Sequence, residues 1–352
     1  MSTQIVFAVP GDLSTATGGY TYDRRVIEEL QSLGFAVTVV DLGGGFPRPS
    51  EATRRAALDK LAAVPAGTPI IVDGLALGVM PQIAQLRGRN PLIGLVHHPL
   101  ALETGLAPSD VECFRKSERA ALASMDRVIV TSPTIARVLI EGYGVAPGII
   151  EIAPPGIDPV RCGLRGAARV GGTVSLLSVG IVVTRKGYDV LIAALASLST
   201  LPWHLRIVGD LQRDPAEAAR LEADITKRGL APRVSLEGVV SAERLAELYA
   251  AADLFVLASR YEGYGMAFAQ AIAHGVPIIG TTSGAIAQTV PAGTGILVPP
   301  DDITALASAL HELICKEPER MRLAENARAA AKRLPTWQAA AAIFARTIVA
   351  AR

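Results

Sequence analysis

Residues 260–277 read RYEGYGMAFAQAIAHGVP, and they follow an apolar strand expected over residues 254–258. A lone acid, Glu262, two glycines and the start of a helix that ends at Gly275 thus meet at the carboxyl end of a strand. Open α/β sheets bind ligands at that edge, and the amides and dipole of a helix N-terminus attract phosphate. Because Glu262 is an anion like phosphate, we expect it to face a sugar hydroxyl or a developing cation. The stretch therefore indicates a site for a phosphate and a polyol.

Short apolar runs alternate with helical patterns along most of the chain, which is typical of parallel sheets covered on both faces by helices. The runs form two series, and they predict an α/β protein with two Rossmann-like, doubly wound domains that face one another. The expected strands are Ile5–Val9, Ala36–Val40, Pro69–Val72, Leu92–Val96, Arg127–Val130 and Ile149–Ile152, then Val174–Val179, Leu205–Val208, Val234–Leu236, Leu254–Leu257, Pro277–Ile279 and Gly295–Val298.

A linker is expected between the two series, where consecutive prolines, Pro154 and Pro155, forbid a helix and no strand pattern follows until about residue 172. We therefore expect an N-terminal, acceptor-side domain over residues 1–165 and a C-terminal, donor-side domain over residues 166–334. A last amphipathic helix, over residues 335–352, either returns to the first domain or caps the second.

Composition excludes several classes of protein. Half of the 352 residues are apolar, 19% are charged and the formal net charge is +1, so no nucleic-acid partner is expected and membrane contact is at most peripheral. The three scattered cysteines, Cys113, Cys162 and Cys315, suit a reducing cytosol and argue against a disulfide framework or a zinc site. Residues 1–10 read as a first strand rather than a signal peptide. We expect a cytoplasmic protein, at most peripheral to the inner face of the membrane.

The opening stretch resembles the E-x7-E region of retaining GT-B glycosyltransferases of family four, the glycosyl transferases group 1 type. In that family the first Glu lies by the donor sugar, the Gly-aromatic-Gly amides meet the diphosphate, and the second Glu holds the ribose. The first Glu corresponds to Glu262, and the second position holds Gln270, which keeps hydrogen bonding but loses its charge-assisted part. The resemblance implies a GT-B architecture and a donor site made by Gly263, Tyr264, Gly265, Met266, Ala267 and Gln270.

A second motif, VGIVVTRKGYDVLI over residues 179–192, joins a strand to a helix. Arg185 and Lys186 come at the expected helix entrance, where the dipole disfavours cations, so we expect an anion to neutralise them. The stretch resembles the family's G-R-x-x-x-x-K-G motif, whose Arg and Lys clamp the diphosphate. Lys186 matches the Lys, whereas Ile181 stands at the Arg position. Arg185 either replaces that guanidinium or is a solvated surface charge.

The first domain carries weaker signals. Gly18 and Gly19 lie between the first strand and the first helix and resemble the family's Gly-Gly loop near the donor phosphate, although a full G-x-G-x-x-G dinucleotide fingerprint is absent. His97 and His98 end the fourth strand and are candidates for contact with sugar hydroxyls, as the family often has a His there. We favour His98 as the inward-facing one; the alternative is a histidine that caps the strand. A vicinal pair lacks zinc-ligand spacing, so no metal site is expected.

Two lesser stretches complete the expected donor pocket. Gly238 and Val239 resemble the family's base-binding segment, and residues 284–288 resemble its G-G-x-P-E loop, with Gln288 in place of Glu.

The resemblance implies sugar transfer, with retention, from a UDP-, GDP- or ADP-linked donor to an acceptor hydroxyl. Neither a metal nor a cofactor is expected besides that donor, which is a co-substrate. Three alternatives stay open: a sugar-nucleotide 2-epimerase on the same scaffold, a non-catalytic nucleotide-sugar binder and an NAD-dependent oxidoreductase. Hydrolysis by paired carboxylates has little support, because only Glu262 is well placed.

Overall fold

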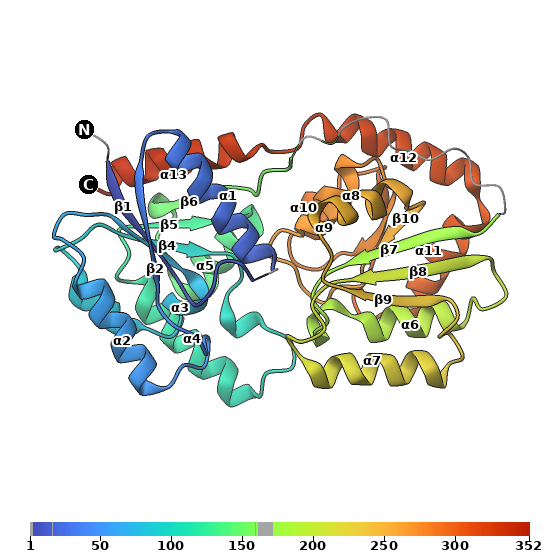
Figure 1. Cartoon of the computed structure of the whole chain (residues 1–352), viewed down its shortest axis with the longest axis horizontal. Coiled ribbons are helices and arrows are strands. Elements are labelled where there is room, and N and C mark those ends of the chain that lie inside the picture. Colours follow the sequence, from blue (N-terminus) through green and yellow to red (C-terminus); the bar gives the residue numbers. More distant parts are fainter. Residues whose placement is uncertain (1–2, 16, 159, 161–171) are drawn as a thin grey trace. The chain divides into compact units, whose positions relative to one another are not determined.

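The computed structural model describes residues 3–15, 17–158, 160 and 172–352 (Figure 1). The chain forms two compact units, the first made of Met1–Gly156 with Pro335–Arg352 and the second of Ile157–Leu334. The expected domain boundary between residues 165 and 166 lies outside the described residues.

A six-stranded parallel sheet forms the centre of the first unit, in the order β2-β1-β3-β4-β5-β6. Its strands are β1 (Gln4–Val9), β2 (Ala36–Asp41), β3 (Ile70–Asp73), β4 (Leu92–Val96), β5 (Arg127–Val130) and β6 (Ile150–Ile152). The helices of this unit are α1 (Gly18–Ser32), α2 (Glu51–Ala62), α3 (Gly74–Leu77), α4 (Pro108–Leu122), α5 (Pro133–Tyr143) and α13 (Trp337–Ala350), with short 3-10 turns η1 (Pro81–Leu86), η2 (Leu100–Leu102) and η3 (Pro147–Ile149).

A second six-stranded parallel sheet, in the order β12-β11-β10-β7-β8-β9, forms the centre of the second unit. Its strands are β7 (Val174–Val179), β8 (Trp203–Val208), β9 (Val234–Gly238), β10 (Leu254–Val256), β11 (Ile278–Thr281) and β12 (Gly295–Val298). The surrounding helices are η4 (Thr184–Lys186), α6 (Tyr188–Ala196), α7 (Pro215–Lys227), α8 (Ala242–Ala251), α9 (Met266–Ala273), α10 (Ile286–Thr289), α11 (Ile303–Cys315) and α12 (Glu317–Ala331).

The predicted fold class is confirmed, and each expected strand is present with its ends shifted by two residues at most. Buried runs such as Ile70, Ile71 and Val72 explain this, because strands covered on both faces need apolar side chains at every position. The strand order also decides where the site lies. β7 and β10 are neighbours in the second sheet, and β3 and β4 are neighbours in the first, so the loops that follow each pair lie side by side.

The last helix, α13, packs on α1 within the first unit. The Tyr22 ring of α1 is the centre of this contact, with its centroid 5.9 Å from that of Trp337 and 6.1 Å from that of Phe344. The Tyr22 hydroxyl donates a hydrogen bond to the carbonyl of Ala153, 2.8 Å away, which ties the helix pair to the end of the sheet. Among the described residues, no helix combines the length and the apolar character needed to cross a membrane.

Candidate functional site

Two loops of the second unit, after β7 and after β10, are held together by one backbone–backbone and one side chain–backbone hydrogen bond. The Arg260 amide donates to the Arg185 carbonyl at 2.8 Å, and the Arg185 guanidinium donates to the Tyr261 carbonyl at 2.9 Å. Gly187 makes this approach possible, because it has a positive φ of 66° and a Cβ there would lie 2.1 Å from the Ala258 carbonyl oxygen. The sequence motifs around residues 185 and 262 therefore form one site.

Glu262 is the centre of this site and is only 7% exposed. Its Oε1 accepts hydrogen bonds from Lys186 Nζ at 2.7 Å and from the Ser259 hydroxyl at 2.6 Å, and its Oε2 lies 3.5 Å from the Arg185 guanidinium. Burial by itself would raise the pKa of Glu262, but the charges of Lys186 and Arg185 and the two hydrogen bonds lower it to about 2. Glu262 is therefore an anion at physiological pH.

The structure brings the predicted residues Glu262, Lys186 and Arg185 together, and it also shows how the two cations are neutralised. We expected an anion to neutralise Arg185 and Lys186, and we expected Glu262 to face a sugar hydroxyl or a developing cation; the structure shows that the Glu262 carboxylate is itself a counter-ion of both cations. The alternative that Arg185 is a solvated surface charge is wrong, because its side chain is 14% exposed. The two cations also precede the helix rather than opening it: they lie on η4, and α6 begins at Tyr188 after the left-handed Gly187.

Helix α9 begins at Met266, after the loop formed by Glu262, Gly263, Tyr264 and Gly265. Gly265 precedes its first residue with a positive φ of 92°, and Met266 and Ala267 form its first turn, whose amides point out of the helix end. Burial raises the pKa of Tyr264 to about 12, so this phenol stays neutral. The segment of residues 284–288 packs against the backbone of Glu262. The Ala285 amide donates to the Glu262 carbonyl at 2.9 Å, and a Cβ on Gly284 would lie 2.2 Å from that oxygen.

The remaining predicted donor residues lie at the edge of the second sheet and along α9. Gly238 ends β9 with a positive φ of 67°, and Val239 after it is 58% exposed. Gln270 is half-buried in α9, and Gln288 is exposed. Neither glutamine side chain makes a hydrogen bond to another described residue, so both amides are free to meet a ligand.

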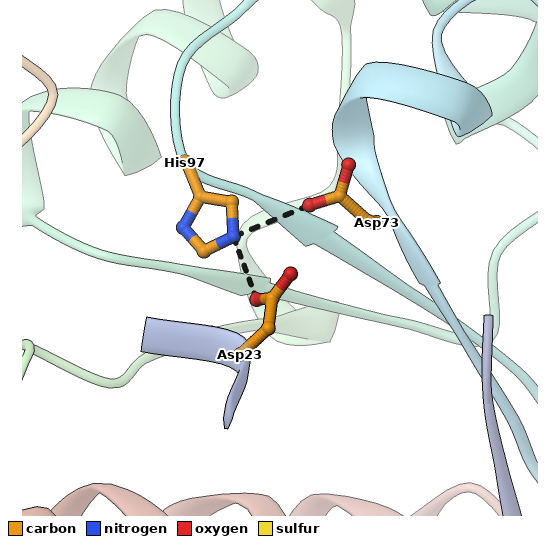
Figure 2. Close-up of side chains that lie close together, drawn as sticks. All are labelled: Asp23, Asp73 and His97. Atoms are coloured by element: carbon orange, nitrogen blue, oxygen red, sulfur yellow. Dashed lines mark hydrogen bonds and ion pairs between the residues drawn. The ribbon is translucent and has the colours of Figure 1, made fainter. Parts of the chain in front are cut away.

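A separate ionic cluster lies in the first unit, where Asp73 ends β3, His97 follows β4 and Asp23 comes from α1 (Figure 2). His97 Nε2 lies 3.0 Å from Asp23 Oδ1 and 3.3 Å from Asp73 Oδ2. Asp73 also accepts the Leu75 amide at 2.8 Å through Oδ1 and so caps α3. Burial would lower the pKa of His97, but the two carboxylates outweigh it and raise that pKa.

The predicted glycine loop and the second histidine lie beside this cluster. Thr17 caps α1, which starts at Gly18, and a Cβ on Gly19 would be 3.7 Å from the His97 ring. His98 Nε2 lies 3.9 Å from Glu103. His97 contacts both aspartates, and the side chains of His97 and His98 are 21% and 18% exposed. That His98 is the one that contacts a sugar hydroxyl stays a prediction. The expectation of no metal site rested on the scattered cysteines and on the vicinal histidine pair, and neither observation considers the two distant aspartates that the structure places beside His97.

Comparison with known proteins agrees with these motifs. Residues 168–330 match the family described as glycosyl transferases group 1, and residues 70–161 match glycosyltransferase family 4. The D-inositol 3-phosphate glycosyltransferase of Xylanimonas cellulosilytica is 32% identical over 284 residues, which is 74% of this chain and 67% of that protein. The chain belongs to the glycosyl transferases group 1 family.

Further relatives and several solved structures are also similar to this chain. The mannosylfructose-phosphate synthase of Agrobacterium fabrum is 36% identical over 185 residues, but the match covers 48% of this chain and only 40% of that protein. Among solved structures, a sucrose-phosphate synthase from Thermosynechococcus elongatus has a TM-score of 0.83 at 24% identity, covering 97% of this chain and 98% of that one. HepE from Anabaena, solved with UDP-glucose, has a TM-score of 0.74 at 19% identity, covering 98% and 99%. These structures share the two-domain GT-B fold.

Arg260 holds the loops around Glu262 together, and the sequence analysis did not identify it. Its guanidinium donates to both carboxylate oxygens of Asp189, at 3.0 and 2.7 Å, and to Asp301 at 2.8 Å, and it also reaches the Thr184 carbonyl at 2.5 Å. One side chain therefore joins η4, α6 and the loop after β12. The only sequence signal was its position two residues before Glu262.

In the first unit, the buried carboxylate of Glu118 holds a loop in place, as the Arg260 guanidinium does in the second unit. Its carboxylate accepts the amides of Leu100 at 2.6 Å and Ala101 at 3.2 Å, and the Tyr143 hydroxyl at 3.0 Å. Burial raises the pKa of Glu118, and these hydrogen bonds oppose that rise. The segment that follows His97 and His98 is fixed in this way, because its first two free amides are satisfied by a buried acid. A lone Glu in the middle of α4 gave no hint of this contact.

Proposed function

We propose that this glycosyltransferase moves a sugar from a nucleotide-diphosphate sugar to an acceptor hydroxyl, with retention of anomeric configuration and without a metal at the diphosphate. The observation that carries the proposal is the pair of buried cations, Lys186 and Arg185, gathered around Glu262 next to the N-terminus of α9. Two cations against one carboxylate leave one net positive charge, and the first-turn amides add to it. This positive charge can stabilise the negative charge of a diphosphate leaving group.

Binding of the donor diphosphate would exchange partners within this cluster. The phosphate oxygens take hydrogen bonds from Lys186, Arg185 and the amides of Met266 and Ala267, while Glu262 keeps the cations in place and turns its second oxygen toward the donor sugar. Gln270 is placed one turn further along α9, where it suits a ribose hydroxyl, and the exposed Val239 beside Gly238 suits a nucleobase face. No divalent cation is needed at the diphosphate, because Lys186 and Arg185 supply the positive charge.

In the reaction, the bond between the anomeric carbon and the diphosphate oxygen breaks, and the acceptor oxygen forms its bond on the same face of the sugar. The leaving phosphate oxygen takes the acceptor's proton, so no protein base is required. Lys186 and Arg185 stabilise the charge that grows on the leaving group, and one such preorganised donor is commonly worth about 3 kcal/mol. His97, His98 and the loop at Gly18 and Gly19 belong to the unit that we propose receives the acceptor.

The donor class is supported by HepE, which was solved with UDP-glucose, and by relatives named for sugar transfer. We propose a UDP-linked donor first, with GDP and ADP as alternatives. We also propose a cytoplasmic location, peripheral to the membrane at most, and no cofactor besides the donor.

Thermal unfolding with UDP, GDP, ADP and NAD in parallel tests the proposal, because a ligand that binds only the folded state raises the melting temperature. We expect one nucleoside diphosphate to stabilise the wild-type protein and to fail with Lys186→Ala, and NAD to have no effect. Release of that nucleotide from its sugar conjugate, dependent on a hydroxyl acceptor, then establishes transfer. Donor turnover without an acceptor would instead indicate an epimerase, and nucleotide binding without turnover on any acceptor would indicate a non-catalytic binder.

A further inference from the structure

The cluster of Asp23, Asp73 and His97 has more negative charge than its interior position can easily hold. Asp23 is fully buried, Asp73 is 4% exposed and the His97 side chain is 21% exposed. Even with His97 protonated, two carboxylates face one positive charge. Among the described residues, the ion pairs of Asp23 and Asp73 are both with His97, and neither carboxylate pairs with a Lys or Arg. A buried carboxylate without a matching cation is costly, so the cluster lacks one positive partner.

One carboxylate oxygen shows where that partner belongs. Asp23 Oδ2 is buried and has no hydrogen-bond partner among the described residues. In Figure 2 the Asp23 carboxylate lies across from Asp73, with its second oxygen turned toward that side, and His97 completes the group. Buried polar atoms are nearly always satisfied, so an unpartnered carboxylate oxygen at this point indicates a ligand.

The spacing of the three groups fits a metal ion. The ligand atoms of Asp23, Asp73 and His97 all lie within 4.8 Å of one another, with His97 Nε2 at 3.0 and 3.3 Å from the two carboxylate oxygens. Ligands bound at roughly 2.0–2.2 Å to one ion are separated from each other by about 2.8–3.6 Å in octahedral or tetrahedral geometry, and both separations that involve His97 lie in this range. The Leu75 amide already orients Asp73 through its other oxygen, as outer hydrogen bonds do at metal sites.

We propose that Asp23, Asp73 and His97 bind a divalent transition-metal ion of the Mn²⁺ to Zn²⁺ series. Two carboxylates and one imidazole suit these ions better than Ca²⁺, which takes six or more oxygen ligands, and better than the all-thiolate sites of soft metals. With His97 neutral, the ion balances both carboxylates, and bidentate binding by Asp23 gives its Oδ2 a partner as well as its Oδ1. It joins α1 to the ends of β3 and β4, beside Gly19, and is separate from the leaving-group chemistry of the second unit. Three protein ligands leave room for water or a hydroxyl group as a further ligand.

The test uses the full chain, stripped with a chelator and titrated calorimetrically with Zn²⁺ and, separately, Mn²⁺. Exposed His311 and Cys315 lie 3.9 Å apart on α11 and could bind Zn²⁺ adventitiously, so every protein carries His311→Ala and Cys315→Ser. We expect one equivalent to bind and to raise the melting temperature. His97→Ala should weaken binding by about 100-fold or more, the upper end of what loss of an outer-shell partner costs.

Two further measurements keep the proposal open to refutation if His97→Ala unfolds. Asp73→Asn should lose binding in the same way, whereas His98→Ala, which removes the neighbouring ring, should leave the metal affinity unchanged. The proposal is overturned if the stripped protein binds no stoichiometric metal, or if His97→Ala binds as tightly as the parent. Nitrogen NMR of His97 with Zn²⁺ present is an independent check: two protonated ring nitrogens would mean that protons, not a metal, balance the cluster. None of these outcomes depends on sugar transfer.

Discussion

The two ionic clusters occupy the same kind of place in their units and have opposite charge balance. Beyond β7 and β10, two cations surround the carboxylate of Glu262; beyond β3 and β4, two carboxylates surround the imidazole of His97. The carboxyl edge of a parallel sheet decides where a ligand binds, but the side chains decide its charge. This difference is the reason why we propose an anionic ligand for the second unit and a cation for the first.

The largest expected effect comes from replacing Gly187, which allows the two loops that carry the cationic cluster to approach each other. The cationic cluster is Lys186, Arg185 and Glu262. Gly187→Ala places a Cβ 2.1 Å from the Ala258 carbonyl at a φ of 66°, so both a clash and backbone strain oppose folding. We expect a loss of about 4 kcal/mol of unfolding free energy, measured with urea.

Gly229→Ala is the matched control for that measurement. Gly229 has a similar φ of 69° but nothing within 4 Å of its Cβ position, so only the strain, about 1 kcal/mol, should remain. Equal losses in the two variants would show that the close approach to Ala258 does not hold the cluster together.

Lys186→Ala tests the cationic cluster itself. Loss of one preorganised donor to the leaving group should lower kcat/KM for transfer by about 10²–10³-fold, or roughly 3 kcal/mol. Lys227→Ala, which removes an exposed lysine at the end of α7, is the control and should leave transfer unchanged. Retention of near wild-type turnover by Lys186→Ala would remove this residue from the proposed mechanism.

Lowering the pH should protonate Glu262 and remove its ion pairs with Lys186 and Arg185. The pKa of Glu262 in the folded protein is about 2, below its ordinary value of 4.5, so its ion pairs stabilise the fold fully above about pH 4.5 and lose that effect as pH falls through 2. The shift corresponds to about 3 kcal/mol at neutral pH. Urea unfolding should therefore show a gap between wild type and Glu262→Gln that falls to about half near pH ~3. A gap that stays constant between neutral pH and pH ~3 would contradict the lowered pKa.

The smallest expected effect concerns the ribose contact. Gln270→Glu restores a charge-assisted acceptor, which is about twice as strong as a neutral one, so we expect nucleotide affinity to rise about fivefold, or roughly 1 kcal/mol. Calorimetric titration with UDP measures this, and Gln288→Glu on α10 is the comparison variant. Unchanged affinity would place the ribose away from Gln270.

The strands and the motifs around Glu262 were predictable, because buried apolar runs and a Gly-rich helix start are local signals. The contact between Lys186 and Glu262 was not, since it joins residues 76 positions apart and depends on β7 and β10 being neighbours. The orientation of His97 depended on the exact strand end, which sequence patterns do not fix. Asp23 and Asp73 were missed because one resembles a solvated helix residue and the other an ordinary helix cap.

The close approach of Gly156 to Trp337 has a consequence for how this chain can be cut. A Cβ on Gly156 would lie 2.1 Å from the Trp337 backbone nitrogen, so the chain leaves the first unit and re-enters it at one point. In topological terms, residues 157–334 are an insertion into the first unit, whose two cut ends already touch. A single short peptide joining Gly156 to Pro335 would restore a continuous chain for that unit, with β1 to β6 and α13 in their native order.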